Sequence, residues 1–135
     1  MAKESGLAWT TMSIDDSAGV LQALVNDITN IDLATPRNVQ EITGMDKSAI
    51  ERLLLLVDFS GTYNGVFNDA ANTSHDVFKT VSSTSVKRTC THVVSGQTLT
   101  VEALLTDYPL TRAASGELTY AVPAVLADGA VPTWT

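Results

Sequence analysis

The sequence predicts a mainly β fold, on three observations. Thr, Val and Ile make up 37 of the 135 residues, and β-branched side chains favour strands. Apolar and polar residues alternate along residues 53–67, which is typical of a long strand with one dry and one wet face. A run at 86–94, a tight turn at 95–97 and an alternating run at 98–106 indicate an antiparallel hairpin.

Length and composition indicate one globular domain spanning residues 1–135. A folded chain of 14.3 kDa exposes about 6,800 Å², against about 20,700 Å² when extended, which leaves enough buried surface for one core and none for a second. Hydrophobic residues make up 44% and charged residues 17%, a globular balance.

Strands and breaks alternate along the N-terminal part of the chain. We expect a flexible arm at 1–7, then a strand at 8–14 that ends in an Asp/Ser/Gly turn cluster at 15–19. Residues 20–25 fit either a helical turn or the start of a strand.

The least strand-like segment is 36–52, which holds much of the charge of the chain. The strand-like residues 28–33 lead to Pro36, which blocks further regular pairing. Ser48 to Glu51 match a helix capping box, a pattern common by chance. We therefore expect a long loop with room for one helical turn.

The long strand at 53–67 has one mostly apolar face: Leu53, Leu55, Val57, Phe59, Gly61, Tyr63, Gly65 and Phe67. A second capping box, at 73–76, predicts a helix of about two turns. Alternation at 118–122 predicts a further strand, and an extended tail follows the turn at 128–129.

The charge balance excludes a protein that grips nucleic acid through its phosphates. The net charge is −7, and the Lys and Arg residues are scattered rather than clustered. The single cysteine, Cys90, excludes an intrachain disulfide and favours a reducing compartment. Without an apolar leader or a run of about 20 apolar residues, the sequence predicts folding in a cytoplasm, with no membrane contact.

Residue patterns typical of enzymes are incomplete, so we expect no catalysis and no cofactor. Gly44 to Ser48 resemble the end of a phosphate-binding loop but lack its glycines. Cys90 and His92 on one strand, even with His75, are too few for a metal site; a buried cysteine and a surface histidine explain them better.

Two acidic pairs and two tryptophans near the termini are further candidate sites. Turns and solvated strand edges explain Asp15-Asp16 and the pair Asp27/Asp32 better than calcium binding or paired-acid chemistry. Trp9 and Trp134 either anchor a partner or close the core.

Several segments, taken in order, resemble one family over nearly the whole chain. They are SGLAWTTMSIDD, NDITNIDLATPRNVQEITGMDKSAIERLLLLVDFSGTYNGVFND, HDVFKTVSSTSVKRT, TDYPLTRAASGEL and VLADGAVPTW. The chain resembles the major tail tube proteins of long, non-contractile phage tails, especially those of actinobacteriophages. Residues 18–25 depart from that pattern, where a more polar lead-in is expected.

The resemblance implies a small β-sandwich or barrel with one short flanking helix, a long inter-ring loop and extended termini. It implies hexameric rings, with strands merged between subunits, stacked into a hollow tube that conducts DNA into the host without binding it specifically. The implied location is the virion tail, with assembly in the host cytoplasm. The implied partners are other copies and the tape measure, distal tail and terminator proteins.

Within that resemblance we expect two sets of functional residues. The inter-ring loop candidates are Arg37, Glu41, Asp46, Lys47, Glu51 and Arg52. Asp58, Glu102 and Glu117 lie on the polar faces of predicted strands and are the candidates for an acidic lumen. Six copies of a chain with net charge −7 would carry −42, which would repel phosphates and let DNA slide.

Two other function classes remain open from the sequence. One is a small β-barrel that binds an apolar ligand as a monomer or dimer; the other is a small hydrolase, which the missing nucleophile–base pattern disfavours. The state of assembly separates the tube from both.

Overall fold

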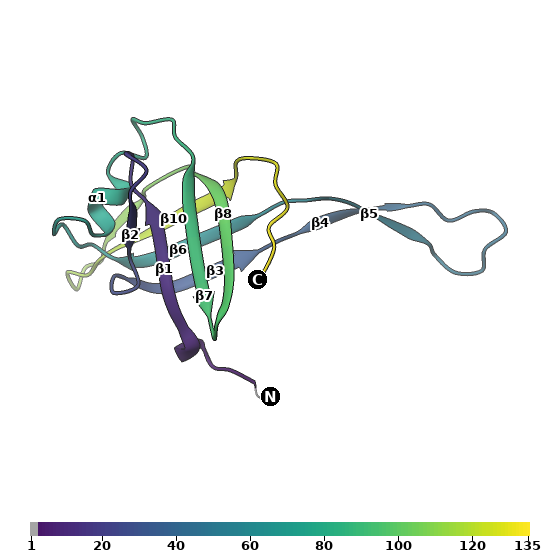
Figure 1. Cartoon of the computed structure of the whole chain (residues 1–135), viewed down its shortest axis with the longest axis horizontal. Helices are drawn as coiled ribbons and strands as arrows, with labels where there is room; N and C mark the ends of the chain where they lie inside the picture. The colour runs from purple at the N-terminus through teal and green to yellow at the C-terminus, as the bar shows by residue number, and fades with distance from the viewer. Residues whose placement is uncertain (1–2) are drawn as a thin grey trace.

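The computed structural model describes residues 3–135 and arranges its main strands in two layers (Figure 1). The first layer contains β1 (Trp9–Asp15), β2 (Leu21–Ala23), β7 (Arg88–Val94) and β8 (Gln97–Leu105). The second contains β3 (Ile28–Ala34), β6 (Ser60–Val66), β9 (Leu110–Arg112) and β10 (Leu118–Leu126).

The two layers are joined at a corner where the end of β8 pairs with the end of β10. The strand order is β2-β1-β7-β8-β10-β6-β3, with β9 beside the first half of β10. Among the described strands, pairing ends at β2 on one side and at β3 on the other. The molecule is therefore sandwich-like and mainly β, as predicted, and not a closed barrel.

Alternate side chains of both layers meet in one core, as the period of two in the sequence requires. The buried apolar residues include Met12, Ile14, Phe59, Tyr63, Phe78, Cys90, Leu99, Val101, Tyr120 and Val122. Along β6 the apolar face predicted from the sequence is the buried one.

The segment 36–52 differs from the expected loop. Residues Arg37–Glu41 form β4 and pair with β5 (Arg52–Val57), and residues 42–51 form the tip of this hairpin without a helical turn. The sequence concealed β4 because both faces of the hairpin are exposed, so its residues have no dry side to alternate against.

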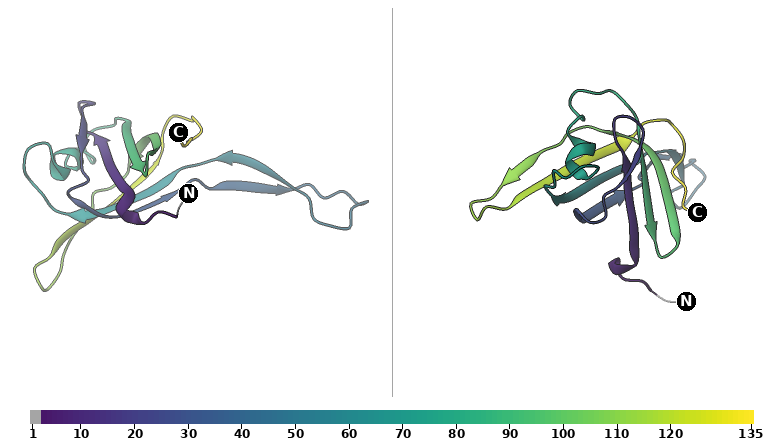
Figure 2. Two further views of the ribbon diagram at one scale, coloured as in Figure 1. Left: turned by 60° about the horizontal axis from the view of Figure 1, so that its bottom comes forward. Right: turned by 60° about the vertical axis from the view of Figure 1, so that its left-hand side comes forward.

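The predicted strand at 53–67 is divided into β5 and β6 at Asp58 and Phe59. Opposite this break Pro36 lacks an N–H, but its carbonyl accepts a hydrogen bond of 2.9 Å from the Asp58 N–H. β3–β6 and β4–β5 thus form one long ribbon with an irregular joint, and Figure 2 shows the β4–β5 half projecting from the body.

The shorter elements refine the remaining expectations. Residues 20–25 contain a strand, β2, rather than a helical turn. The helix α1 (Ser74–Phe78) begins where the capping box predicted but is only five residues long. The predicted flexible N-terminal segment, 1–7, ends in a 3₁₀ turn formed by Gly6–Ala8, and residues 1–2 lie outside the described part.

Candidate assembly surfaces

The β4–β5 hairpin, residues 37–57, is called the arm below (Figure 1). Its strands expose apolar side chains on both faces, because Leu54 lies opposite Val39 whereas the adjacent Leu53 lies opposite Gln40. The large exposed apolar residues of the arm are Val39, Ile42, Met45, Ile50, Leu53, Leu54, Leu55 and Leu56. A patch of this extent marks an interaction surface on a protein of this size.

All six predicted inter-ring residues lie on the arm, at the two ends of its strand pair and in its tip. Arg37 and Glu41 belong to β4, Arg52 begins β5, and the other three lie in the tip: Asp46, Lys47 and Glu51. All six are exposed. The Nε of Arg37 donates a hydrogen bond of 2.9 Å to the Leu55 carbonyl, which holds the two strands together at the base.

The outer face of β3, β6 and β10 is called the polar face. Its aligned rows are Asn30–Asn64–Ala121, Asp32–Thr62–Pro123 and Ala34–Ser60–Val125. Strand periodicity places the neighbouring residues Ile31, Tyr63 and Val122 on the core side. Among these three strands, Asp32 is the one charged side chain directed to the polar face.

The three predicted lumen residues do not share a surface. Glu102 lies in β8 and accepts a hydrogen bond from the Thr89 hydroxyl, on the outer face of the other layer. Asp58 lies at the β5–β6 break and Glu117 in the turn before β10, so neither is a strand residue as the sequence suggested. Asp58 and Glu117 flank opposite ends of the β6–β10 pair, because Ser60 faces Val125 and Val66 faces Thr119.

A groove of about 410 Å³ lies between β1 and the start of β3, where the two layers are not joined. We call it the edge groove. Most of its lining residues are apolar, with Thr29 and Asn30 as polar members: Gly6, Trp9, Met12, Val25, Ile28, Thr29, Asn30 and Ile31. Trp9 helps to close the core, as one of its two interpretations predicted, because it packs edge-on against buried His92; it also lines the groove. Trp134 is 47% exposed and bridges to Leu99.

Histidine 92 corrects the expectation of a surface side chain, because it is completely buried. Its Nδ1 lies 3.0 Å from the Leu99 carbonyl and its Nε2 lies 2.8 Å from the Tyr63 hydroxyl. A carbonyl only accepts, so Nδ1 holds the proton and Nε2 accepts from Tyr63. Burial lowers the pKa of His92 and keeps the ring neutral.

The other metal and acid candidates also have structural partners. Burial raises the pKa of the Cys90 thiol to about 12. Asp27 is buried, not solvated as expected, and it accepts hydrogen bonds from the Asn68 amide and from the Ser74 N–H at the start of α1. Among residues 3–135, no three His, Cys, Asp or Glu side chains are grouped to hold a metal ion.

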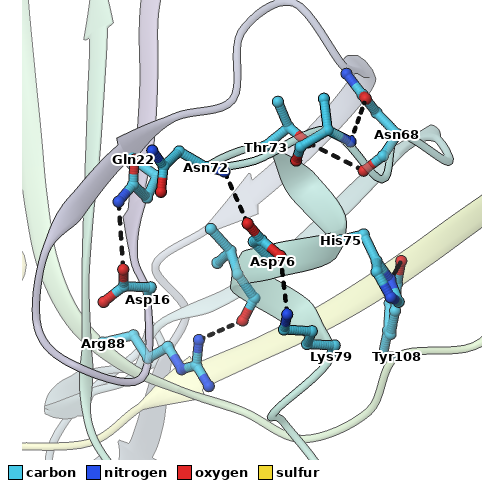
Figure 3. A network of polar contacts seen from close by, with 12 residues as sticks. Asp16, Gln22, Asn68, Asn72, Thr73, His75, Asp76, Lys79, Arg88 and Tyr108 are labelled. Carbon is cyan, nitrogen blue, oxygen red and sulfur yellow. Dashed lines mark hydrogen bonds and ion pairs between the residues drawn. The ribbon is translucent and has the colours of Figure 1, made fainter.

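A buried arginine joins α1 to the first layer (Figure 3). Arg88 donates hydrogen bonds to the carbonyls of Asp15 and Val77 and to the Thr80 hydroxyl. Nearby, Asp76 accepts from the Asn72 N–H at 2.8 Å and from the Lys79 ammonium at 2.9 Å. These contacts fix the helix and its flanking turns, and each is explained by the fold alone.

The chain exposes more surface than a compact monomer. Its accessible surface is 8354 Å², against about 6,800 Å² expected for a folded monomer of 14.3 kDa. The excess of about 1,500 Å² is close to the total area of a standard protein–protein interface. No helix in the described part of the chain is long and apolar enough to cross a membrane.

Comparison with known proteins gives a fold and no sequence family. No protein-family model matches the sequence, and no curated protein matches it. The structure is similar to a chain in the virion of a native gene transfer agent particle, with a TM-score of 0.77 and 13% identity over 98% of this chain and 99% of that one. A chain in the tail of an empty gene transfer agent particle, refined with C6 symmetry, matches with a TM-score of 0.72 and 14% identity over the same shares of both chains. The chain therefore has the fold of these particle proteins along almost its entire length.

Proposed function

We propose that this chain is a structural protein of a phage-like tail, whose copies form rings that stack into a hollow tube for DNA. The observation that carries the proposal is the fold match over 98% of the chain to proteins of gene transfer agent particles, one in a tail refined with sixfold symmetry. The protein acts in the virion and catalyses no reaction.

Ring formation is supported by the two free edges of the second layer. Its strand order, β9-β10-β6-β3, ends in β9 and β3, which have unpaired edges within the described chain. Such edges invite pairing with another chain, and a closed ring of subunits removes them. The order predicts a continuous inner barrel with four strands from each subunit.

Stacking of rings is assigned to the arm. Its exposed leucines have no partner within the body of the described molecule, and an extended ribbon can reach beyond its own ring. The six charged candidates lie at the two ends of the strand pair and in the tip, and they would fix the register of the contact, since charged pairs give specificity more than affinity. The tape measure, distal tail and terminator proteins are the partners proposed for the ends of the tube.

The bore is assigned to the polar face, with Asp32 as its strand carboxylate. Hydroxyls, amides and small side chains offer passing phosphates nothing to grip, and the strands that bear this face direct no Lys or Arg into it. Asp58 and Glu117 remain candidates for the two rims of each ring, because they flank the same layer. Glu102 belongs to the outer surface in this arrangement.

Electron microscopy of the purified protein, with a concentration series by light scattering, tests the proposal. We expect rings or hollow tubes. A chain that remains monomeric at high concentration, even with a tail initiator complex, would instead favour the small ligand-binding alternative, for which the edge groove is a suitable cavity.

A further inference from the structure

We infer that the edge groove is a socket for Leu110 and Leu118 of a second copy of this chain. The inference rests on the proposed ring and names the contact that holds neighbouring subunits together. Three independent features lead to it: the direction of the free strands, their alignment along the sheet, and the side to which the two leucines point.

The directions of the free strands are suitable for pairing between copies. Neighbours in the series β9, β10, β6 and β3 are all antiparallel, so β9 and β3 run in opposite directions. A rotation about an axis close to the strand direction preserves the direction of every strand. In a ring, β9 of one copy therefore lies antiparallel to β3 of the next, and antiparallel pairing satisfies both open edges.

The alignment along the sheet brings Leu110 level with the groove. Leu110 faces Tyr120, Tyr120 faces Gly65, and Gly65 faces Ile28, so all four belong to one row across the sheet. When the sheet continues into a second copy without stagger, its Leu110 lies at the height of Ile28, which lines the edge groove. If the second copy is shifted by two residues along the strand, its Leu110 lies level with another groove-lining residue on the same side of the sheet.

The two leucines point to the core side of the sheet. Leu110 and Leu118 alternate with Thr111 and Thr119 and share the side of Tyr120, which is only 2% exposed. Yet Leu110 is 47% and Leu118 38% exposed, because the layer above them ends before β9. Ile28 and Ile31 also face the core side, so the neighbour's leucines would enter the groove and not the polar face.

The size of the groove fits this occupant. A cavity of about 150 Å³ can hold a benzene molecule, so about 410 Å³ has room for two leucine side chains. The arm is a poorer candidate, because it leaves β3 after Ala34, at the opposite end from Ile28. The excess surface of about 1,500 Å² is enough for such a contact as well as for stacking.

Cysteine cross-linking tests the assignment. Cys90 is buried, so it leaves little background, and we would introduce Leu110→Cys together with Val25→Cys, or with Thr29→Cys as a second acceptor. Oxidation of assembled protein should link neighbours into a ladder that ends at the number of subunits in the ring. Because the contact joins unlike surfaces, Leu110→Cys alone should give no linked dimer.

The competing occupant is tested by the same experiment with Leu56→Cys from the arm. This inference would be overturned by tubes in which the cysteine of Val25→Cys forms a disulfide with that of Leu56→Cys. It would also be overturned by tubes in which the cysteine of Leu110→Cys forms none with either acceptor. Both results would leave the proposed tube intact. Absence of any ring or tube from the unmodified protein would overturn both.

Substitution gives a second measurement that does not depend on disulfide geometry. Leu110→Ser with Leu118→Ser should abolish ring formation while the subunit stays folded with only a modest loss of thermal stability, since both side chains are partly exposed in the monomer. Val20→Ser, at an exposed valine before β2, is the matched control and should assemble normally. Normal rings from the double leucine variant would count against the socket.

Discussion

The Tyr63 hydroxyl donates a hydrogen bond of 2.8 Å to Nε2 of His92, and the two rings stack at an interplanar angle of 18° between the layers. Tyr63 comes from β6 of the second layer and His92 from β7 of the first. This pair joins the two layers in the middle of the core, where a charged imidazolium would have no acidic partner.

Acidification should therefore destabilise the subunit. Burial lowers the pKa of His92 in the folded state, whereas the unfolded chain takes up a proton near pH 6.5. As the pH falls below about 6.5 the unfolded state binds the extra proton first, so stability is lost by up to ~1.4 kcal/mol per pH unit until the folded pKa is reached. Thermal unfolding of the unassembled subunit between about pH 8 and pH 5 measures this loss.

The control is His75→Gln, at the partly exposed histidine of α1. This variant keeps the Tyr63–His92 pair and should still lose stability on acidification. Tyr63→Phe removes the hydroxyl, leaves Nε2 of His92 without its donor, and should lower the free energy of unfolding by ~1–3 kcal/mol. A profile that is flat through this range would show that His92 titrates as an exposed residue.

Arg88→Lys should destabilise the subunit although it preserves the charge. The guanidinium reaches two carbonyls and a hydroxyl on two segments, the end of β1 and the stretch from α1 to Thr80, which one ammonium cannot do. We expect a loss of ~2–4 kcal/mol by denaturant unfolding, because buried carbonyls are left without a donor. Lys79→Ala, at an exposed ion pair on α1, should change stability by less than ~1 kcal/mol.

Gly65→Ala should be poorly tolerated. A Cβ at this position would lie 2.5 Å from the Asp27 carbonyl oxygen and 2.5 Å from the Tyr120 hydroxyl. Relieving that contact must move backbone or a packed ring, so we expect a loss of ~1–3 kcal/mol in the free energy of unfolding. Gly6→Ala, which would meet no atom within 4 Å, is the matched control. Equal stability of the two variants would disprove the close packing.

Changes on the arm should separate folding from stacking. Leu54→Asp with Leu56→Asp alters one exposed face of the ribbon, so the circular dichroism spectrum should be unchanged while tubes fail to grow beyond single rings. Deletion of residues 39–47, which removes most of β4, should have the same effect on growth. Tubes of normal length from either variant, seen by electron microscopy, would remove the arm from the ring-to-ring contact.

A lysine in the bore should slow DNA transit. Asp32→Lys changes the polar face by two charges per subunit, or twelve in a ring of six, and the retardation should weaken as salt screens it over ~8 Å at physiological ionic strength. Ejection kinetics at two salt concentrations measure this effect. Glu102→Lys, on the other layer, is the control that should eject normally; slowing by Glu102→Lys alone would place the other layer around the DNA.

The sequence predicted mainly those strands that have one buried face. β6, β8 and β10 alternate in sequence because one face of each is buried, whereas the buried face of β7 carries Arg88, Cys90 and His92. β4 and β9 were missed because all their residues are exposed in the single chain. Because these residues have no buried side to alternate against, periodicity has nothing to detect there.

The structure distributes the predicted assembly residues over several surfaces. The charged residues of 36–52 lie on one projecting element, the arm, although the sequence predicted a loop there and not a pair of strands. The lumen set was scattered by the structure, because alternation identifies a polar face of a strand but not which layer that strand joins. The sequence assigned Asp32 to a solvated strand edge, and it lies exposed on β3, at the free edge of the second layer.

A reconstruction by electron microscopy of tubes assembled from the purified chain would show how the subunits meet. We expect stacked rings, with β9 of each copy paired to β3 of the next and with Asn30, Asp32 and Thr62 lining the bore. Filaments whose bore is lined instead by the β7–β8 face with Glu102, or subunits that pair through no free edge, would contradict it.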